Sequence, residues 1–113
     1  MTGGINGSTD FALVERQKKP KSQLSEAQIE SRFVKLANER GAMCIKFTSP
    51  GLPGVPDRIV ITADGRTIYV ELKTVAGKLA GIQQWVIQEM RKRSADVRVL
   101  RGLDAVKEFV KEL

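Results

Sequence analysis

The sequence predicts an α/β domain of about four strands, and three observations lead to this class. Two β-branched, apolar runs at 58–61 and 68–72 flank an Asp64-Gly65 turn, which indicates an antiparallel hairpin. Amphipathic helical patterns come before and after that hairpin. A further apolar run at 97–100 follows the second helix, so its strand is expected to join the sheet by a parallel crossover.

The first predicted helix begins at Ser25 and ends at Gly41. Ser25 and Gln28 match a capping box, and Leu24 and Ile29 are spaced as a hydrophobic staple. A glycine directly after the periodic pattern is typical of a helix C-terminus. The expected core stripe consists of Ile29, Phe33, Leu36 and Ala37.

Two acids of this helix, Glu26 and Glu30, fall near the apolar stripe rather than opposite it. An acid on a buried face is unusual unless it has a partner, so both are candidates for a site against the sheet. A carboxylate in the first helical turn also interacts favourably with the helix macrodipole, which requires no site. Both interpretations of Glu26 stay open on the residues alone.

The first strand is predicted at 42–47 and is followed by a loop rich in glycine and proline at 48–54. Lys46 interrupts the apolar run, which a position at the solvent end of the strand would explain. Ser49 lies in the loop, whose backbone is a candidate for close approach to a phosphate. Cys44 is the single cysteine, so it cannot form an internal disulfide, and we expect a small buried hydrophobe there.

The hairpin allows two registers. A two-residue Asp64-Gly65 turn places Ile59 and Ile61 on the same face as Ile68, Val70 and Leu72, but it places Asp57 and Glu71 on opposite faces. A three-residue loop brings Asp57 and Glu71 to one face and sorts the apolar residues less well. We expect the two-residue turn, with a bend or bulge at Pro56-Asp57 that swings Asp57 toward Glu71.

Asp57, Glu71 and Lys73 form the candidate catalytic cluster. Glu71 and Lys73 are two residues apart on one strand and therefore share a face, while Leu72 points the other way. Two carboxylates on neighbouring strands can bind one hard divalent cation, and a nearby lysine can orient a water. This equipment suits metal-assisted phosphodiester hydrolysis. The chain has no histidine, which excludes histidine zinc ligands and a histidine general base.

The second helix is predicted at 79–93 and the last at 104–110. Gln83 lies on the edge of the second helix's stripe, where a half-buried amide is expected. Trp85 points away from the stripe, which favours a contact surface or partial cover by a neighbouring loop. Three basic residues, Arg91, Lys92 and Arg93, either complement the helix dipole or contact DNA. The expected stripe consists of Leu79, Ile82, Val86 and Met90.

Composition places one domain at 25–113, preceded by a flexible basic arm at 1–24. The net charge of +6 favours a polyanionic partner, and nucleic acid is the commonest one. No apolar run is long enough for a membrane span, and the N-terminus lacks the apolar core of a signal peptide. We therefore expect a cytoplasmic protein without a membrane partner, in a bacterial cell or a phage-infected host.

An ordered set of motifs resembles the PD-(D/E)xK nucleases and, within them, the small virus-type replication–repair nuclease (VRR-NUC) family. The set consists of Glu26, Gly54-Val55-Pro56-Asp57, Glu71-Leu72-Lys73, Gly77-Lys78-Leu79 and Gln83. The family usually has a glycine just before the fourth strand, where this chain has Ser94-Ala95-Asp96. That departure concerns a turn rather than the chemistry.

The resemblance implies a restriction-endonuclease-like core, a mixed four-stranded sheet flanked by helices in the order α-β-β-β-α-β-α. It implies an Mg²⁺- or Mn²⁺-dependent DNA endonuclease, with branched or flapped DNA as an expected substrate and a homodimer as the expected assembly. The implied catalytic residues are Asp57, Glu71, Lys73, Glu26 and Gln83, and the implied metal ligands are Asp57, Glu71, Glu26 and the Leu72 backbone carbonyl. The expected DNA contacts are Lys46, Ser49, Lys78, Arg91, Lys92 and Arg93. The alternative is a non-catalytic DNA-binding or assembly module with the same fold.

Overall fold

The computed structural model describes residues 24–113, so the predicted basic arm lies outside the described residues except for Leu24. The order of the elements is helix, three strands, helix, strand, helix, which confirms the predicted α/β class. The helices are α2 (Glu26–Glu39), α3 (Gly81–Lys92) and α4 (Gly102–Val110), and the strands are β1 (Met43–Lys46), β2 (Arg58–Ile61), β3 (Thr67–Lys73) and β4 (Val97–Arg101).

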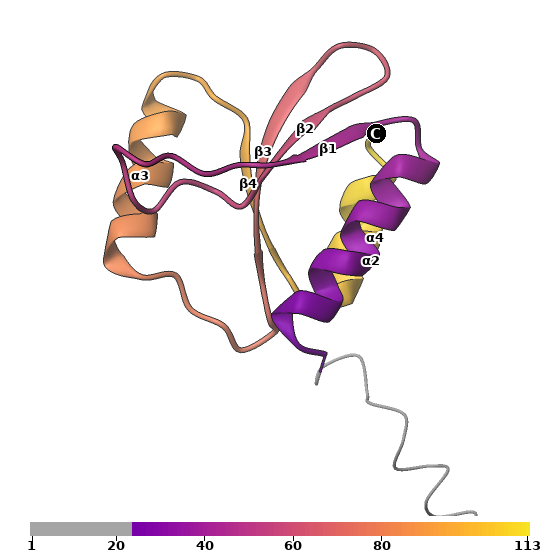
Figure 1. Cartoon of the computed structure of the whole chain (residues 1–113), viewed down its shortest axis with the longest axis horizontal. Coiled ribbons are helices and arrows are strands. Elements are labelled where there is room, and N and C mark those ends of the chain that lie inside the picture. The colour runs from indigo at the N-terminus through magenta and orange to yellow at the C-terminus, as the bar shows by residue number, and fades with distance from the viewer. Residues whose placement is uncertain (1–23) are drawn as a thin grey trace, which may run out of the picture.

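The four strands form one mixed sheet in the order β1-β2-β3-β4. The pairs β1–β2 and β2–β3 are antiparallel, and β3–β4 is parallel, as the intervening helix predicts. Helices α2 and α4 lie together on one side of the sheet and α3 lies on the other (Figure 1). Within residues 24–113, no helix has the length and apolar content that a membrane span requires.

Helix α2 begins as its capping signal predicts. The Ser25 side chain accepts a hydrogen bond from the Gln28 backbone N–H, and the Gln28 side chain accepts one from the Ser25 N–H. Gly41 follows the helix with a φ of 79°, a conformation that glycine adopts without a steric penalty. The helix buries Ile29, Phe33 and Ala37 against the sheet and α4, and Leu36 packs at the edge of this core.

The register of the hairpin differs from the expected one. Ile61 pairs with Thr67 and Arg58 with Val70, and the Thr62 N–H donates to the Arg66 carbonyl, which leaves the three-residue loop Ala63-Asp64-Gly65. Gly65 has a φ of 90°, as such loops require, and the Thr62 hydroxyl donates a hydrogen bond to Asp64 inside the turn. The predicted two-residue turn is therefore wrong, and a bulge at Pro56-Asp57 is not needed to bring Asp57 and Glu71 to one face.

This register also changes which side chains form the core. Val60, rather than its neighbours Ile59 and Ile61, faces α2 and α4. The fully buried residues of this face are Val60, Ile68, Val70 and Leu72. Burial under two helices decides the register, because a slip by one residue would move each of these side chains to the opposite face.

Helix α3 uses a different stripe from the predicted one. Val86 and Ile87 are buried, whereas Ile82 is exposed, so the prediction of Ile82 as a core residue is wrong. The reason is that α3 packs toward β4 across the sheet. The turn after α3 places Ser94 at a φ of 67°, a conformation that favours glycine, at the point where the VRR-NUC pattern usually has a glycine.

Candidate active site

Asp57 lies directly before β2, next to the buried Pro56. Continuing the β2–β3 register by one step places Asp57 opposite Glu71. The Leu72 backbone N–H donates a hydrogen bond to Asp57 Oδ2 at 3.2 Å. Because the N–H and C=O of a strand residue point to the same side, the Leu72 carbonyl is also directed toward the β2 side. Asp57 and the Leu72 backbone therefore meet where the two strands separate.

Glu71 is the most unusual acid of residues 24–113, because its side chain is only 2% exposed. Its Oε2 accepts a hydrogen bond from Gln83 Nε2 at 3.0 Å and lies 3.5 Å from Lys73 Nζ, while its Oε1 is buried with no hydrogen-bond partner. Burial and the nearby charge of Asp57 raise the pKa of Glu71 to about 7, against the opposing effect of Lys73. A buried carboxylate oxygen without a partner is rare in proteins and suits a ligand position.

Gln83 connects this carboxylate to the start of α3. Its Oε1 accepts a hydrogen bond from the Ala80 backbone N–H at 2.9 Å, and its Nε2 donates to Glu71. The backbone donor at one end of the amide requires the oxygen there, so the NH₂ group is directed at Glu71. Gln83 thus holds Glu71 in place and satisfies one of the free N–H groups at the helix start.

The two acids of α2 have different partners. Glu26 Oε1 lies 3.9 Å from Lys73 Nζ, whereas Glu30 forms a salt bridge with Arg58 at 3.2 Å. Lys73 therefore lies between Glu26 on the α2 side and Glu71 on the α3 side. Glu26 remains 53% exposed, which leaves it accessible to a water or an ion.

A cavity of about 230 Å³ opens beside these groups. It is lined by Glu26, Ala27, Glu30, Lys46, Asp57 and Leu72. The cavity is smaller than three others on residues 24–113, of about 590, 290 and 260 Å³, but its lining combines three acids with a lysine and theirs do not. Chemistry rather than size therefore identifies it as the candidate active site.

The predicted DNA contacts do not all gather at this cavity. Lys46 lines it, and Ser49 lies half-buried in the β1–β2 loop, where its carbonyl accepts from Leu52 N–H. Lys78 and Arg91 line a separate, larger cavity. The remaining two, Lys92 and Arg93, form salt bridges with Glu89 on the same helix.

The donor set fits a divalent cation. Asp57 and Glu71 provide carboxylate oxygens, the unpaired Glu71 Oε1 among them, and the Leu72 carbonyl is a third hard oxygen. In residues 24–113, no three His, Cys, Asp or Glu side chains form a ready-made metal cluster. Two carboxylates completed by a backbone carbonyl and waters would suit Mg²⁺, which usually keeps several waters.

No model of a known protein family matches the sequence. One curated protein and one solved structure are similar to it. A protein described as "Putative nuclease p44", from Acyrthosiphon pisum secondary endosymbiont phage 1, is 40% identical over 55 residues. That match covers 49% of this chain and only 59% of the phage protein. A solved structure described as "VRR_NUC domain" has a TM-score of 0.72 and 25% identity, with 76% of this chain and 94% of that chain covered. Both comparisons support the resemblance to the VRR-NUC family.

Within this VRR-NUC fold, sequence reasoning missed the Glu30–Arg58 salt bridge. The expected two-residue turn put Arg58 on the same face as Glu71, whereas the observed register turns it toward α2, where its Nε is buried without a partner. The available signal was a lone arginine in a β-branched strand together with an acid near a helical stripe. That pair accounts for Glu30 and leaves Glu26 as the α2 acid that faces Lys73.

Proposed function

We propose that this chain is a metal-dependent deoxyribonuclease of the VRR-NUC type that hydrolyses phosphodiester bonds. The observation that carries the proposal is the buried Glu71, whose free Oε1 lies in a cluster with Asp57 and Lys73. A buried acid whose pKa is raised to about 7 destabilises the fold and is commonly found where chemistry needs it. The name of the phage relative supports the same activity.

In this mechanism Asp57, Glu71 and the Leu72 carbonyl would hold Mg²⁺ or Mn²⁺. A bound divalent cation supplies Lewis-acid polarisation of a phosphoryl oxygen and lowers the pKa of a coordinated water. Lys73 orients the attacking water and stabilises the charge that develops on the phosphate. Gln83 maintains the position of Glu71, as its two hydrogen bonds indicate.

The α2 side of the site would position the substrate. Glu26 faces Lys73 and is exposed, so it is suited to hold a water or a second cation. Lys46 lines the same cavity and is suited to contact the scissile phosphate, with Ser49 in the adjoining loop. Lys78, Arg91, Lys92 and Arg93 would then contact DNA away from the reacting bond.

We further propose that the substrate is branched or flapped DNA and that the protein acts as a homodimer. In support of the assembly, Trp85 is 51% exposed and borders an apolar cavity of about 290 Å³ together with Leu52 and Met90. The phage origin of the relative agrees with activity inside an infected bacterial cell.

The test is cleavage of labelled duplex, flap and four-way-junction DNA with Mg²⁺ or Mn²⁺. Asp57→Asn and Lys73→Ala are expected to lower the cleavage rate by at least about a hundredfold, because each removes a group at the reacting phosphate. Asp64→Asn is the matched control, since it makes the same chemical change at the exposed tip of the hairpin. Thermal unfolding monitored by circular dichroism verifies that each variant is folded.

Cleavage that needs metal and is lost only in the two site variants supports the nuclease. If the parent binds DNA but never cuts it, the non-catalytic DNA-binding or assembly module replaces the proposal. Equal cutting by the site variants would show that the assigned residues are wrong.

A further inference from the structure

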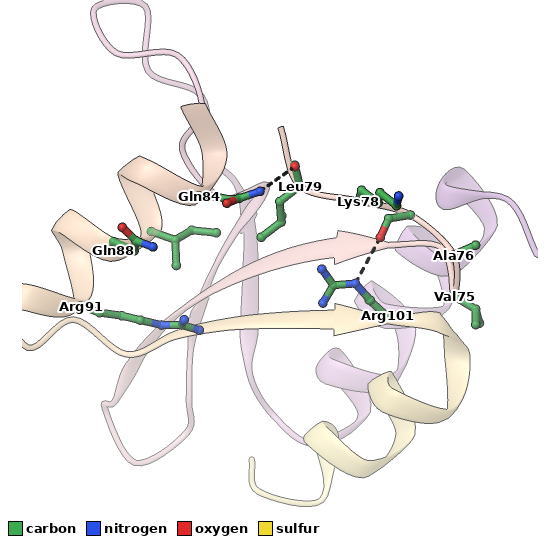
Figure 2. Close-up of a pocket in the computed structure, with 10 residues that line it drawn as sticks. Val75, Ala76, Lys78, Leu79, Gln84, Gln88, Arg91 and Arg101 are labelled. Atoms are coloured by element: carbon green, nitrogen blue, oxygen red, sulfur yellow. Dashed lines mark hydrogen bonds between the residues drawn. The ribbon is translucent and has the colours of Figure 1, made fainter. Parts of the chain in front are cut away.

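A cavity of about 590 Å³ lies beside the segment that joins β3 to α3, outside the candidate active site. Figure 2 shows the labelled side chains that surround it, from this segment, from α3 and from the end of β4. We call this cavity the linker groove and define it by Lys78, Gln84, Gln88, Arg91 and Arg101, together with the backbone of 75–79.

The linker groove is cationic. Three of its lining residues are basic, and no acid of residues 24–113 lines it. Within the same range, none of Lys78, Arg91 and Arg101 forms a salt bridge, whereas Arg58, Lys73 and Arg98 pair with acids. Three cations around one cavity without a compensating acid attract an anionic ligand.

Both arginines are held by backbone carbonyls rather than by acids. Arg101 Nε donates to the Gly77 carbonyl at 3.1 Å, the contact drawn in Figure 2. Arg91 donates through Nε and Nη2 to the Val97 carbonyl at 3.2 and 2.6 Å. A carbonyl positions a guanidinium without neutralising it, so the full charge and the remaining N–H groups stay available to phosphate oxygens.

Two glutamines add neutral polar groups to the groove. Gln84 and Gln88 are four residues apart on α3 and therefore lie on one face of that helix. Gln84 Nε2 also donates to the Leu79 carbonyl at 3.2 Å, which ties the helix to the linker. Amide side chains of this kind contact the sugar–phosphate backbone of DNA without reading its sequence.

The groove and the candidate active-site cavity have no lining residue in common. Residues 75–79 line the groove, and this stretch joins Lys73 at one end to Gln83 at the other. A DNA strand in the groove would therefore leave the candidate active-site cavity free for the scissile phosphate.

We propose that the linker groove binds backbone phosphates of the substrate DNA away from the scissile bond. This inference rests on the proposed function, because it assigns the groove to the same substrate. Cations from three separate elements around a cavity of this volume suit several phosphates along a strand better than one free anion. The groove would unite the predicted DNA contacts Lys78 and Arg91 with Arg101, which sequence reasoning did not single out.

The test measures binding of the full chain to a short labelled duplex by fluorescence anisotropy in EDTA, over a range of NaCl concentrations. The double variant Lys78→Gln/Arg101→Gln removes two groove charges, and Arg32→Gln/Lys35→Gln removes two exposed charges of α2 as the matched control. We expect the groove pair to weaken binding about tenfold and to reduce the slope of log affinity against log salt by about 2, since each phosphate contact contributes roughly 0.9.

Three further measurements separate binding of a DNA strand in the groove from a structural effect of the substitutions, from a role in catalysis and from binding of a free anion. Lys78→Gln alone, which removes no structural hydrogen bond, is expected to show about half of the reduction in slope. With Mg²⁺, the groove pair is expected to raise KM while kcat at saturating DNA stays within about twofold, because uniform binding is lost. Inorganic phosphate and chloride at equal ionic strength are expected to compete equally with DNA for the protein. Selective competition by phosphate would overturn the assignment of the groove to a DNA strand and would indicate a site for a free anion.

The proposal fails if the groove pair and the α2 pair weaken DNA binding to the same extent. Its failure is distinguishable from that of the nuclease. A parent protein that never cuts, combined with a selective loss of binding in the groove pair, keeps the groove and removes the catalytic assignment.

Discussion

The two faces of the central sheet differ in what they do. On the face under α2 and α4, Val60, Ile68, Val70 and Leu72 are all 0% exposed. On the opposite face, α3 covers only the part near β4, and Met43, Ile45 and Ile61 remain 60%, 40% and 37% exposed. The second face carries Glu71 and Lys73. Gln83, near the start of α3, contacts this face through its hydrogen bond to Glu71.

This difference shows how one small domain combines a stable core with an energetically unfavourable site. The closed face gains the burial of a continuous apolar layer, which is the main source of stability. The open face buries an acid with an unpaired oxygen, which costs stability. The alternation of strand residues lets β3 serve both faces, with Leu72 in the core and Glu71 in the site.

The largest expected effect compares two isoleucines of the hairpin that face opposite sides. Ile68→Ala is expected to lower the free energy of unfolding by about 4 kcal/mol, because it leaves a cavity under α2 and α4. Ile61→Ala is expected to cost about 1 kcal/mol or less, since that side chain is already partly in water. Urea denaturation of both variants measures the difference, and equal losses would contradict the division into a closed and an open face.

The next effect compares two glutamines at the same position of two helices. Gln83 and Gln28 each accept a hydrogen bond from the backbone N–H three residues before them, but only Gln83 also contacts Glu71. Gln83→Ala is expected to lower kcat about 10- to 100-fold, because Glu71 loses the donor that orients it. Gln28→Ala is expected to leave kcat unchanged. Its free energy of unfolding is expected to fall by about as much as that of Gln83→Ala, because both variants lose the hydrogen bond to the N-cap N–H. A parallel loss of activity in both variants would mean that Gln83 acts only through its helix.

A smaller effect concerns the pH dependence of stability in the metal-free protein. Burial raises the pKa of Glu71 to about 7 in the folded state, so the folded protein binds more protons than the unfolded chain between about pH 4.5 and 7. The parent therefore loses stability as pH rises through this range. Glu71→Gln removes that loss, and its free energy of unfolding at pH 8 is expected to exceed the parent's by about 1 to 3 kcal/mol.

The same comparison in acid provides the check. At pH 4 Glu71 is protonated in the parent, so the variant and the parent are expected to be about equally stable. Glu108→Gln on α4 is the control, because it makes the same chemical change at an exposed acid. A constant difference between Glu71→Gln and the parent at all pH values would contradict the role of Glu71 ionisation. Denaturant titrations in EDTA across the pH range give these curves.

The smallest expected effect concerns the N-cap residues directly before the two helices that flank the site. Ser25 caps α2 through its side chain, whereas Ala80 has no side-chain cap to offer α3. Ser25→Ala is expected to cost about 1 kcal/mol, and Ala80→Ser is expected to stabilise by up to about 1 kcal/mol, because Gln83 already provides the other half of a capping box. Thermal unfolding of both variants tests this, and destabilisation by Ala80→Ser would contradict it.

The features that depend on short stretches of chain could be predicted from local sequence patterns. The capping box at Ser25, the stop at Gly41, the position of the hairpin and the parallel placement of β4 all follow from local patterns, and the structure has each of them. The motifs that resemble those of the VRR-NUC family were also readable in order, because each motif occupies only a few positions. The roles of Asp57, Glu71 and Lys73 stay predictions that the cleavage assay tests.

Only the tertiary structure decided the features that depend on which face is covered. Both hairpin registers were locally acceptable, and the three-residue loop prevails because α2 and α4 bury Val60, Ile68, Val70 and Leu72 together. That choice places Asp57 opposite Glu71 and turns Arg58 toward Glu30. In the same way, the packing of α3 toward β4 buries Ile87 instead of Ile82. Periodicity shows that a strand or helix has a buried face, but contacts between distant segments decide which residues lie on it.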